Sequence, residues 1–178
     1  MQEISLNILD IAQNSIAANA TLVTISVTEE QDRMRVTVED DGKGMTKEQA
    51  ESVEDPFYTT RTTRKVGLGV PFFKMAAEMT GGSFSVSSQP GAGTVVSAEF
   101  ITSHIDCMPL GDINETILSL VTLNPEIDFV YRLTVNGKGF VMDTREFRRV
   151  LREVPLNAPE VAQFVREFLD ENSREIRI

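Results

Sequence analysis

Two polar residues near the start of the chain have a spacing that would let them act together. Asp10 and Asn14 are four residues apart in a segment with helical periodicity, so they lie on one face of the predicted helix. The amide oxygen of Asn14 can bind a hard cation, and a carboxylate one turn earlier can orient or deprotonate a water molecule. The pair is equally compatible with an ordinary solvated helix face.

A second candidate site lies in the stretch VEDDGKGM, residues 38–45. Asp40, Gly42 and Gly44 form an Asp-x-Gly-x-Gly pattern directly after an alternating strand. Glycine tolerates backbone conformations and close approaches that other residues do not. By itself the pattern also describes a simple turn at the end of a strand.

A third candidate site is the stretch VGLGV, residues 66–70, which opens a predicted helix. The free N–H groups and the dipole of a helix N-terminus favour phosphate. Arg61, Arg64 and Lys65 come just before it and supply a local positive cluster. Basic residues in a loop are usually only solvated, which is the alternative interpretation here.

The composition limits the function classes. With 27 acidic and 17 basic residues among 178, the net charge of −10 disfavours non-specific binding to nucleic acid or to an anionic membrane. The single cysteine, Cys107, excludes an intramolecular disulfide and leaves no cysteine cluster for zinc. The N-terminal segment is not basic, and no apolar run reaches membrane-spanning length. We therefore expect a cytoplasmic protein.

The hydrophobic pattern predicts an α+β protein with two parts, residues 1–103 and residues 104–178. In the first part, strands with one solvent-exposed face alternate with helices. The second part is an αββαα appendage, and its FVYRLTV segment could add strands to the sheet. We expect helices over 4–20, 46–53, 68–82, 112–123, 144–154 and 159–175, and strands over 21–27, 33–39, 83–100 (two), 126–135 and 138–143.

Two details of the appendage are predicted from its residue types. Asn136 and Gly137 suit a tight primed turn between two strands. An apolar stripe on the last helix is interpreted as core, with a dimer or partner surface as the alternative. The stripe consists of Val161, Phe164, Val165 and Phe168.

The order of these features closely resembles the Bergerat ATP-binding fold of the GHKL superfamily, which includes gyrase, Hsp90, histidine kinases and MutL. DIAQNSIAANAT looks like the N box, VEDDGKGM the first glycine box, DPFYTT the phenylalanine box, and VGLGVPFFKMAAEMTGGSFSVSSQPGAGTV the second glycine box with its strands. The resemblance covers roughly residues 4–101, and the amino-acid sequence of these motifs is most similar to the histidine-kinase branch. It implies a two-layer sandwich with a mixed, mostly antiparallel sheet and helices on one face.

The resemblance implies a role for each motif. Asp40 would accept the adenine amine, Asn14 would bind Mg²⁺, and Asp10 would be the catalytic base. Gly42 and Gly44 would let the backbone pass close to the base, and Gly67 and Gly69 would do so at the phosphates. Phe57 would anchor the lid hinge or be a core aromatic. The implied ATP-binding set is Asn14, Asp40, Gly42, Gly44, Met45, Phe57, Arg61, Arg64, Lys65, Val66, Gly67, Leu68, Gly69 and Thr94.

The chain departs from the family pattern at three places. Lys65 replaces the first glycine of the second box, so phosphate contact there would come from a side chain. Asp10 stands where hydrolysing members and anti-sigma kinases have Glu. Ala17 and Ala18 replace the cationic residue that histidine kinases often carry after the N box.

These observations lead to two hypotheses of function. His104, the only histidine of the sequence, is interpreted as a linker residue, and we expect the protein to lack a phosphoacceptor domain of its own. We therefore expect an ATPase or a protein kinase that acts in trans on a partner protein in signalling, with ATP and Mg²⁺ as cofactors. The alternative is an ATP-gated protein-binding module without catalysis, associated with redox proteins of the hydrogenase type. The sequence leaves open whether the protein forms a homodimer.

Overall fold

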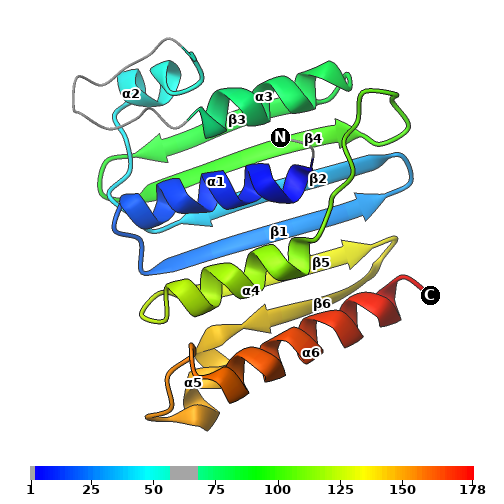
Figure 1. Cartoon of the computed structure of the whole chain (residues 1–178). Helices are drawn as coiled ribbons and strands as arrows, with labels where there is room; N and C mark the ends of the chain where they lie inside the picture. Colours follow the sequence, from blue (N-terminus) through cyan, green and yellow to red (C-terminus); the bar gives the residue numbers. More distant parts are fainter. Residues whose placement is uncertain (1–2, 57–67) are drawn as a thin grey trace.

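A computed structural model of the chain describes residues 3–56 and 68–178. The strands form one six-stranded sheet in the order β3-β4-β2-β1-β5-β6 (Figure 1). The elements are α1 (Ile4–Ala17), β1 (Leu22–Glu30), β2 (Arg33–Asp40), α2 (Lys47–Ser52), α3 (Gly69–Met79), β3 (Ser83–Gln89), β4 (Gly93–Ile101), α4 (Ile113–Leu123), β5 (Asp128–Val135), β6 (Lys138–Asp143), α5 (Thr144–Leu151) and α6 (Pro159–Ile176).

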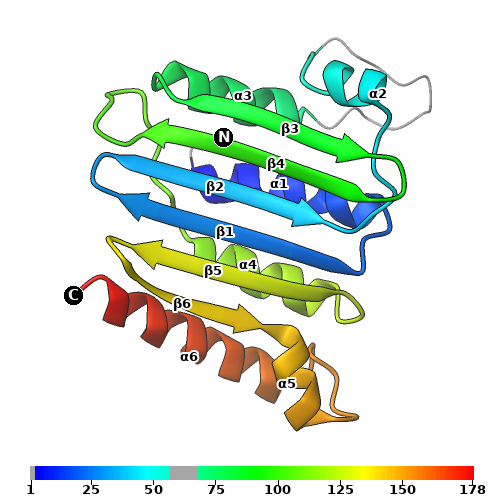
Figure 2. The same cartoon turned by 180° about the vertical axis from the view of Figure 1, so that it is seen from behind.

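The sheet and the long helices form two layers, as the sequence predicted. Helices α1, α3, α4 and α6 lie on one face of the sheet, and Figure 2 shows the strands from the opposite side. Alternation along β1 explains this arrangement, because Val23, Ile25 and Val27 are buried while the intervening side chains are polar and partly exposed. Strand pairing is antiparallel except between β1 and β5.

The hydrophobic core lies between the helices and the sheet and runs through the whole molecule. Helix α1 contributes Ile4, Ile8 and Ile11, which are spaced to face the sheet. Phe73 of α3 packs on Phe100 of β4 with ring centroids 5.8 Å apart. These contacts fix α1 and α3 against the strands that carry the candidate site.

The C-terminal segment extends the same sheet, as expected from its strand pattern. Strand β5 pairs in parallel with β1, and β6 pairs antiparallel with β5. The carbonyl oxygens of Pro109 and Leu110 accept hydrogen bonds from the N–H groups of Ile4 and Ser5, at 3.0 Å and 2.8 Å, and so satisfy the first turn of α1. The boundary between residues 103 and 104 stays a prediction, and the sheet and the core continue across it.

Local backbone geometry explains where elements end. Helix α1 stops at Ala17, three residues earlier than predicted, because Asn19 adopts a positive φ of 60° that cannot continue a helix. Helix α5 stops at Leu151 for the same reason, since Arg152 has φ of 54°. Asn136 and Gly137 both have positive φ, which confirms the primed turn.

Among the described residues, no helix combines the length and the apolar character needed to cross a bilayer.

Two buried hydroxyl groups predict opposite effects on stability. The Tyr131 hydroxyl is buried and has no hydrogen-bond partner among the described residues. The Thr144 hydroxyl is also buried, but it accepts from the Phe129 N–H at 2.9 Å and donates to Asp128 Oδ1 at 3.2 Å. Urea unfolding should show that Tyr131→Phe raises the free energy of unfolding by up to about 1 kcal/mol, whereas Thr144→Val lowers it by about 1–3 kcal/mol. A loss of stability in Tyr131→Phe would contradict this interpretation.

Candidate functional site

The carboxylate of Asp40 lies at the end of β2 and is held from two sides. Ser15 Oγ donates a hydrogen bond of 2.6 Å to Asp40 Oδ2, and the N–H of Gly42 donates one of 2.9 Å to Oδ1. Ser15 is buried in α1, and Asp40 is half-buried. A carboxylate has further acceptor positions on both oxygens, so Asp40 remains able to accept from a ligand amine.

The glycines of the turn after Asp40 are required by contacts within the protein. Gly44 has φ of +69°, and a Cβ there would overlap the carbonyl oxygen of Gln89. A Cβ at Gly42 would stand 2.7 Å from the carbonyl oxygen of Ala18, at the end of α1. The turn is therefore wedged between α1 and the β3–β4 turn. The predicted close approach of these glycines to a base stays a prediction.

The β3–β4 turn is packed against the glycine turn from the other side. Gly93 has φ of +87°, and a Cβ there would overlap the carbonyl oxygen of Asp40. The Gly91 N–H donates to the Lys43 carbonyl at 2.7 Å. Thr94, the next residue in β4, is the register partner of Asp40. The structure thus places Thr94 beside Asp40.

A small hydroxyl network links the two turns. Ser88 Oγ donates to the Gly93 carbonyl at 2.9 Å and accepts from the Met45 N–H at 2.8 Å. Its third neighbour is Thr94 Oγ1 at 2.8 Å. Because Ser88 has one hydroxyl proton, Thr94 donates to Ser88 and keeps its own lone pairs as acceptors.

The contact between α1 and α3 brings Asp10 to the start of a helix. A Cβ at Gly69, the first residue of α3, would lie 3.0 Å from the Cβ of Asp10, so only glycine permits this distance without a shift. Asn14 is exposed one turn further along α1. Burial raises the pKa of the Asp10 carboxyl. Asp10 therefore lies at the first turn of α3, and Asn14 is one turn further along α1.

The N-terminus of α3 is suited to an anion. Its N-cap residue, Leu68, makes no side-chain capping bond, and the first turn carries no acidic residue. Leu68, the N-cap residue, is partly exposed. Backbone N–H groups at such a terminus lack helical acceptors, and the helix dipole favours negative charge there.

Six residues of the predicted binding set lie outside the described residues. These are Phe57, Arg61, Arg64, Lys65, Val66 and Gly67. The remaining members fall into two groups on neighbouring elements. One group surrounds Asp40 at the ends of β2 and β4, and the other surrounds Asp10 where α1 meets α3.

Sequence reasoning missed Ser15, Ser88 and Asp41. Ser15 follows Asn14 and falls on the buried side of α1 by helical spacing, which was the available signal. Ser88 looked like one of several strand serines. Asp41 accepts hydrogen bonds from the Thr21 N–H at 2.7 Å and the Leu22 N–H at 3.0 Å. Burial alone would raise the Asp41 pKa, but these bonds and that from the Thr21 hydroxyl lower it.

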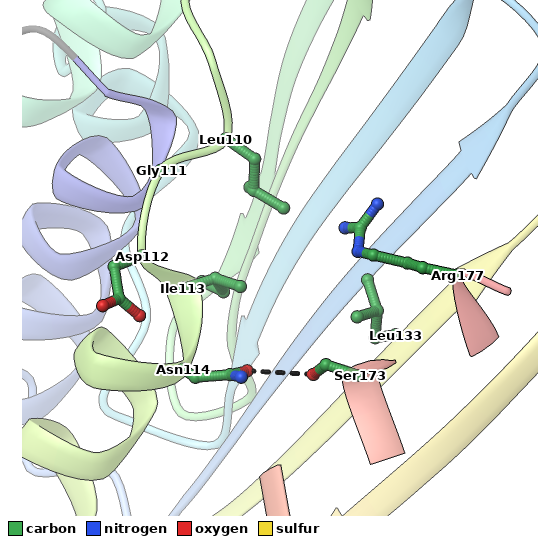
Figure 3. Close-up of a pocket in the computed structure, with 8 residues that line it drawn as sticks. All are labelled: Leu110, Gly111, Asp112, Ile113, Asn114, Leu133, Ser173 and Arg177. Carbon is green, nitrogen blue, oxygen red and sulfur yellow. Dashed lines mark hydrogen bonds between the residues drawn. The ribbon is translucent and has the colours of Figure 1, made fainter. Parts of the chain in front are cut away.

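A cavity of about 240 Å³ lies elsewhere in the molecule, between the start of α4 and the end of α6 (Figure 3). Its walls include Leu110, Ile113, Leu133 and Arg177, and none of the predicted site residues lines it. Arg177 is held by a salt bridge of 2.7 Å to Glu29. This cavity is therefore separate from the groups around Asp40 and Asp10.

Comparison with known proteins assigns the family. The family model described as "Histidine kinase-, DNA gyrase B-, and HSP90-like ATPase" matches residues 1–104. This match covers more than half of the chain, and the two residue groups described above lie within it. The chain belongs to this family of ATP-binding domains, and it contains a histidine-kinase-like ATPase domain.

Individual relatives agree with this assignment over part of their length. The sensor histidine kinase ZraS of Klebsiella oxytoca is 32% identical over 96 residues, which make up 53% of this chain and 20% of that protein. Sporulation kinase C of Bacillus subtilis is 30% identical over 89 residues, 49% of this chain and 21% of that protein. The chain thus spans about a fifth of the length of these curated relatives.

A solved structure supports the fold. The MutL ATPase domain of Aquifex aeolicus, complexed with ADP, superimposes with a TM-score of 0.54 at 14% identity. The overlap covers 85% of this chain and 70% of that chain. At this identity the likeness shows the fold alone, and it extends beyond residue 104 into the C-terminal segment.

Alanine substitutions at Gly44 and at Gly91 test how tightly the turn after Asp40 is packed. Gly44→Ala should lower the free energy of unfolding by about 2–5 kcal/mol. The added Cβ would overlap backbone atoms of the opposite turn, and alanine would be strained at this positive φ. Gly91→Ala is the matched control, since Gly91 also has positive φ but its Cβ would meet nothing within 4 Å. Its cost should be only about 1–2 kcal/mol. Equal losses in urea unfolding would show that the contact with Gln89 is unimportant.

Asp10 and Asp41 predict opposite pH dependence of stability. The raised Asp10 pKa favours the protonated carboxyl in the folded state, so its contribution to stability is lost as pH rises above about 4. Asp10→Asn should remove this loss and stabilise the protein at neutral pH by at most a few tenths of a kcal/mol, since solvent screens the carboxylate. Urea unfolding across the acidic to neutral range measures the effect.

Asp41→Asn is the control of opposite sign. The lowered Asp41 pKa means that its ionised form stabilises the fold at neutral pH and that this contribution is lost as pH falls. The variant should therefore be less stable than the wild type at neutral pH, with the difference closing in acid. Parallel pH curves for both variants would contradict the two assignments.

Proposed function

We propose that this protein binds Mg-ATP and acts in trans on a partner protein, as a kinase or as a slow ATPase. The observation that carries the proposal is the close contact of Asp10 with Gly69 at the start of α3. This contact puts a partly buried carboxylate beside a helix N-terminus whose N-cap residue makes no side-chain capping bond. The two groups suit a proton acceptor and a phosphate site, respectively.

Asp40 would recognise the base. Its carboxylate is oriented by Ser15 and by the Gly42 N–H, so it is fixed before any ligand arrives. A fixed carboxylate suits an exocyclic amine, and the lone pairs of the Thr94 hydroxyl offer a further acceptor beside it. An adenine-type base fits these groups.

Asn14 would supply a protein ligand to Mg²⁺. The described residues hold no cluster of three or more His, Cys, Asp or Glu side chains suited to a metal. Mg²⁺ in nucleotide sites commonly uses one or two protein oxygens together with phosphate oxygens and water. The exposed amide of Asn14, one turn from Asp10, fits such a site. The ion would neutralise phosphate charge there.

Asp10 would accept a proton from the attacking hydroxyl of water or of a partner. Burial raises the Asp10 pKa, which makes the carboxylate a better base at neutral pH than a fully solvated aspartate. Because aspartate is one methylene shorter than glutamate, its reach depends on how closely α1 and α3 approach. The Gly69 contact provides this close approach.

Action in trans is supported by the position of His104. This histidine follows β4, whose last residue Ile101 pairs with Arg33 at the start of β2. Asp40 is at the other end of β2, seven residues away, or roughly 23 Å along the strand. His104 therefore lies at the opposite end of the sheet from the candidate site, where it cannot receive phosphate from it.

An exposed apolar stripe beside the site offers a surface for the partner. Leu68, Phe72, Met75 and Met79 follow helical spacing along α3, and each is between 39% and 52% exposed. The stripe starts at the residue before Gly69. Methionine-rich surfaces adapt readily to apolar helices of other proteins. A partner segment docked on α3 would lie close to Asp10.

An ATP-gated binding module is the second candidate. The observation that favours it is the salt bridge of 2.8 Å from Lys74 of α3 to Glu54, which directly follows α2 and Val53. A ligand that shifts α3 would also move Glu54 through this salt bridge, without any chemical reaction. This candidate predicts nucleotide binding with neither phosphate release nor transfer.

Calorimetry with Mg-ATP, together with a phosphate-release assay, tests the proposal. Asp40→Asn should weaken binding by about 10- to 150-fold, because a charge-assisted hydrogen bond to the base is lost. Asp10→Ala should keep binding but lower phosphate release by about 10²- to 10⁴-fold. Wild-type binding without release, and without transfer to any co-purifying protein, would favour the gated module.

The matched control is Asp41→Asn, which removes the neighbouring carboxylate. Asp41 binds Thr21 and Leu22, so this variant should lose stability but retain Mg-ATP binding. No binding by the wild type, or equal losses in Asp40→Asn and Asp41→Asn, would overturn the assignment of the base site.

A further inference from the structure

An apolar patch is exposed on α5 and α6, beyond the edge strand β6. Its centre consists of Val150, which is 83% exposed, Phe164, which is 53% exposed, and Val154. Val150 belongs to α5, Val154 to the turn after α5, and Phe164 to α6. We call this surface, together with the charged residues on its two sides, the α5–α6 face.

The aromatic part of the α5–α6 face is held in place by the core. The Phe164 ring packs edge-on against Phe147 of α5, with centroids 5.6 Å apart, and lies 6.4 Å from Phe168. Phe168 in turn contacts Phe140 of β6 at 6.2 Å. Phe164 is therefore a fixed apolar side chain with one side in solvent, which suits an interface anchor.

The α5 side of the face is basic. Between residues 144 and 154 there are four arginines and two glutamates. Arg145 and Arg148 are engaged by Asp143 and Asp128 through salt bridges of 2.8 Å and 2.7 Å. The side chains of Arg149 and Arg152 are exposed and form no hydrogen bond or salt bridge with any described residue, although the charge of Arg149 helps to lower the pKa of Asp143. They are available to a partner.

The α6 side of the face is acidic. Between residues 159 and 171 there are four acids and one arginine. Glu160, Glu167 and Glu171 are exposed, and helical spacing puts them on the same side of α6 as Phe164. Arg166, the one arginine, points elsewhere and forms a salt bridge of 2.7 Å with Glu115 of α4.

We propose that the α5–α6 face binds the same face of a second copy of this chain, forming a two-fold symmetric dimer. In such an interface a patch meets itself, so its basic side lies against the acidic side of the partner copy. The α5–α6 face has this self-complementary order: arginines, apolar centre, glutamates. A uniformly acidic or basic partner would match only one side. The charge pattern therefore favours a second copy.

The dimer would leave the candidate nucleotide site free. Strand β6 is at one edge of the sheet, and β2 and β4, which carry Asp40 and Thr94, lie three or more strands away. Figure 1 shows α5 and α6 beside β6 and α3 beside β3. Both copies could thus bind nucleotide and present the stripe on α3. The proposal holds whether or not the proposed ATP chemistry is correct.

Sedimentation velocity of the full chain, with paired charge reversals, tests the dimer. The wild type should show a concentration-dependent dimer. Arg149→Glu with Arg152→Glu makes both sides acidic, and Glu160→Arg with Glu167→Arg makes both sides basic. Each double variant alone should have its dimer dissociation constant raised at least about tenfold. Arg132→Glu, on an exposed residue of β5, is the matched control and should dimerise as the wild type does.

Mixing the two double variants gives the decisive result. In the mixed dimer both pairs of sides are again opposite in charge, so the mixture should recover the dimer that neither variant forms alone. Misfolding of a variant would not be repaired in this way. A wild type that stays monomeric at about 100 μM, dimers unaffected by the reversals, or no recovery on mixing would each overturn the proposal.

Discussion

The close contact of two backbone turns at the end of β2 is the constraint on which the candidate site depends. A Cβ at Gly44 or at Gly93 would overlap a carbonyl oxygen of the opposite turn. Because both residues are glycine, the turns can meet, and their contact leaves the Asp40 carboxylate half-buried within reach of Ser15. The position of the Asp40 carboxylate thus rests on backbone packing.

Helix α1 connects this packing to the start of α3, where we propose that phosphate binds. Its buried isoleucines attach it to the sheet, Ser15 holds Asp40, and Asp10 meets the first residue of α3. One helix therefore sets the distance between the group that would bind the base and the group that would accept a proton. Since the loop at Pro109 and Leu110 satisfies the first N–H groups of α1, the C-terminal segment also supports the site.

The C-terminal segment completes the sheet, as its strand pattern predicted. Strand β5 covers what would be an open edge of β1, and its parallel pairing brings α4 onto the helix layer. An exposed edge strand is prone to unwanted pairing, so this extension protects the ATP-binding fold. The segment also carries the α5–α6 face, at the edge of the sheet furthest from β3.

The sequence by itself determined the family and most elements, because periodicity and glycine motifs are local signals. It predicted Asp10, Asn14, Asp40 and Thr94 as candidate site residues, which stays a prediction, and it predicted the primed turn at Asn136. Only the tertiary structure decided that Ser15 and Ser88 belong to the site and that Gly42 and Gly44 are constrained by Ala18 and Gln89. It also decided the parallel pairing of β5 with β1. These contacts join residues far apart in the chain, and no local pattern specifies which distant backbone will fill the space.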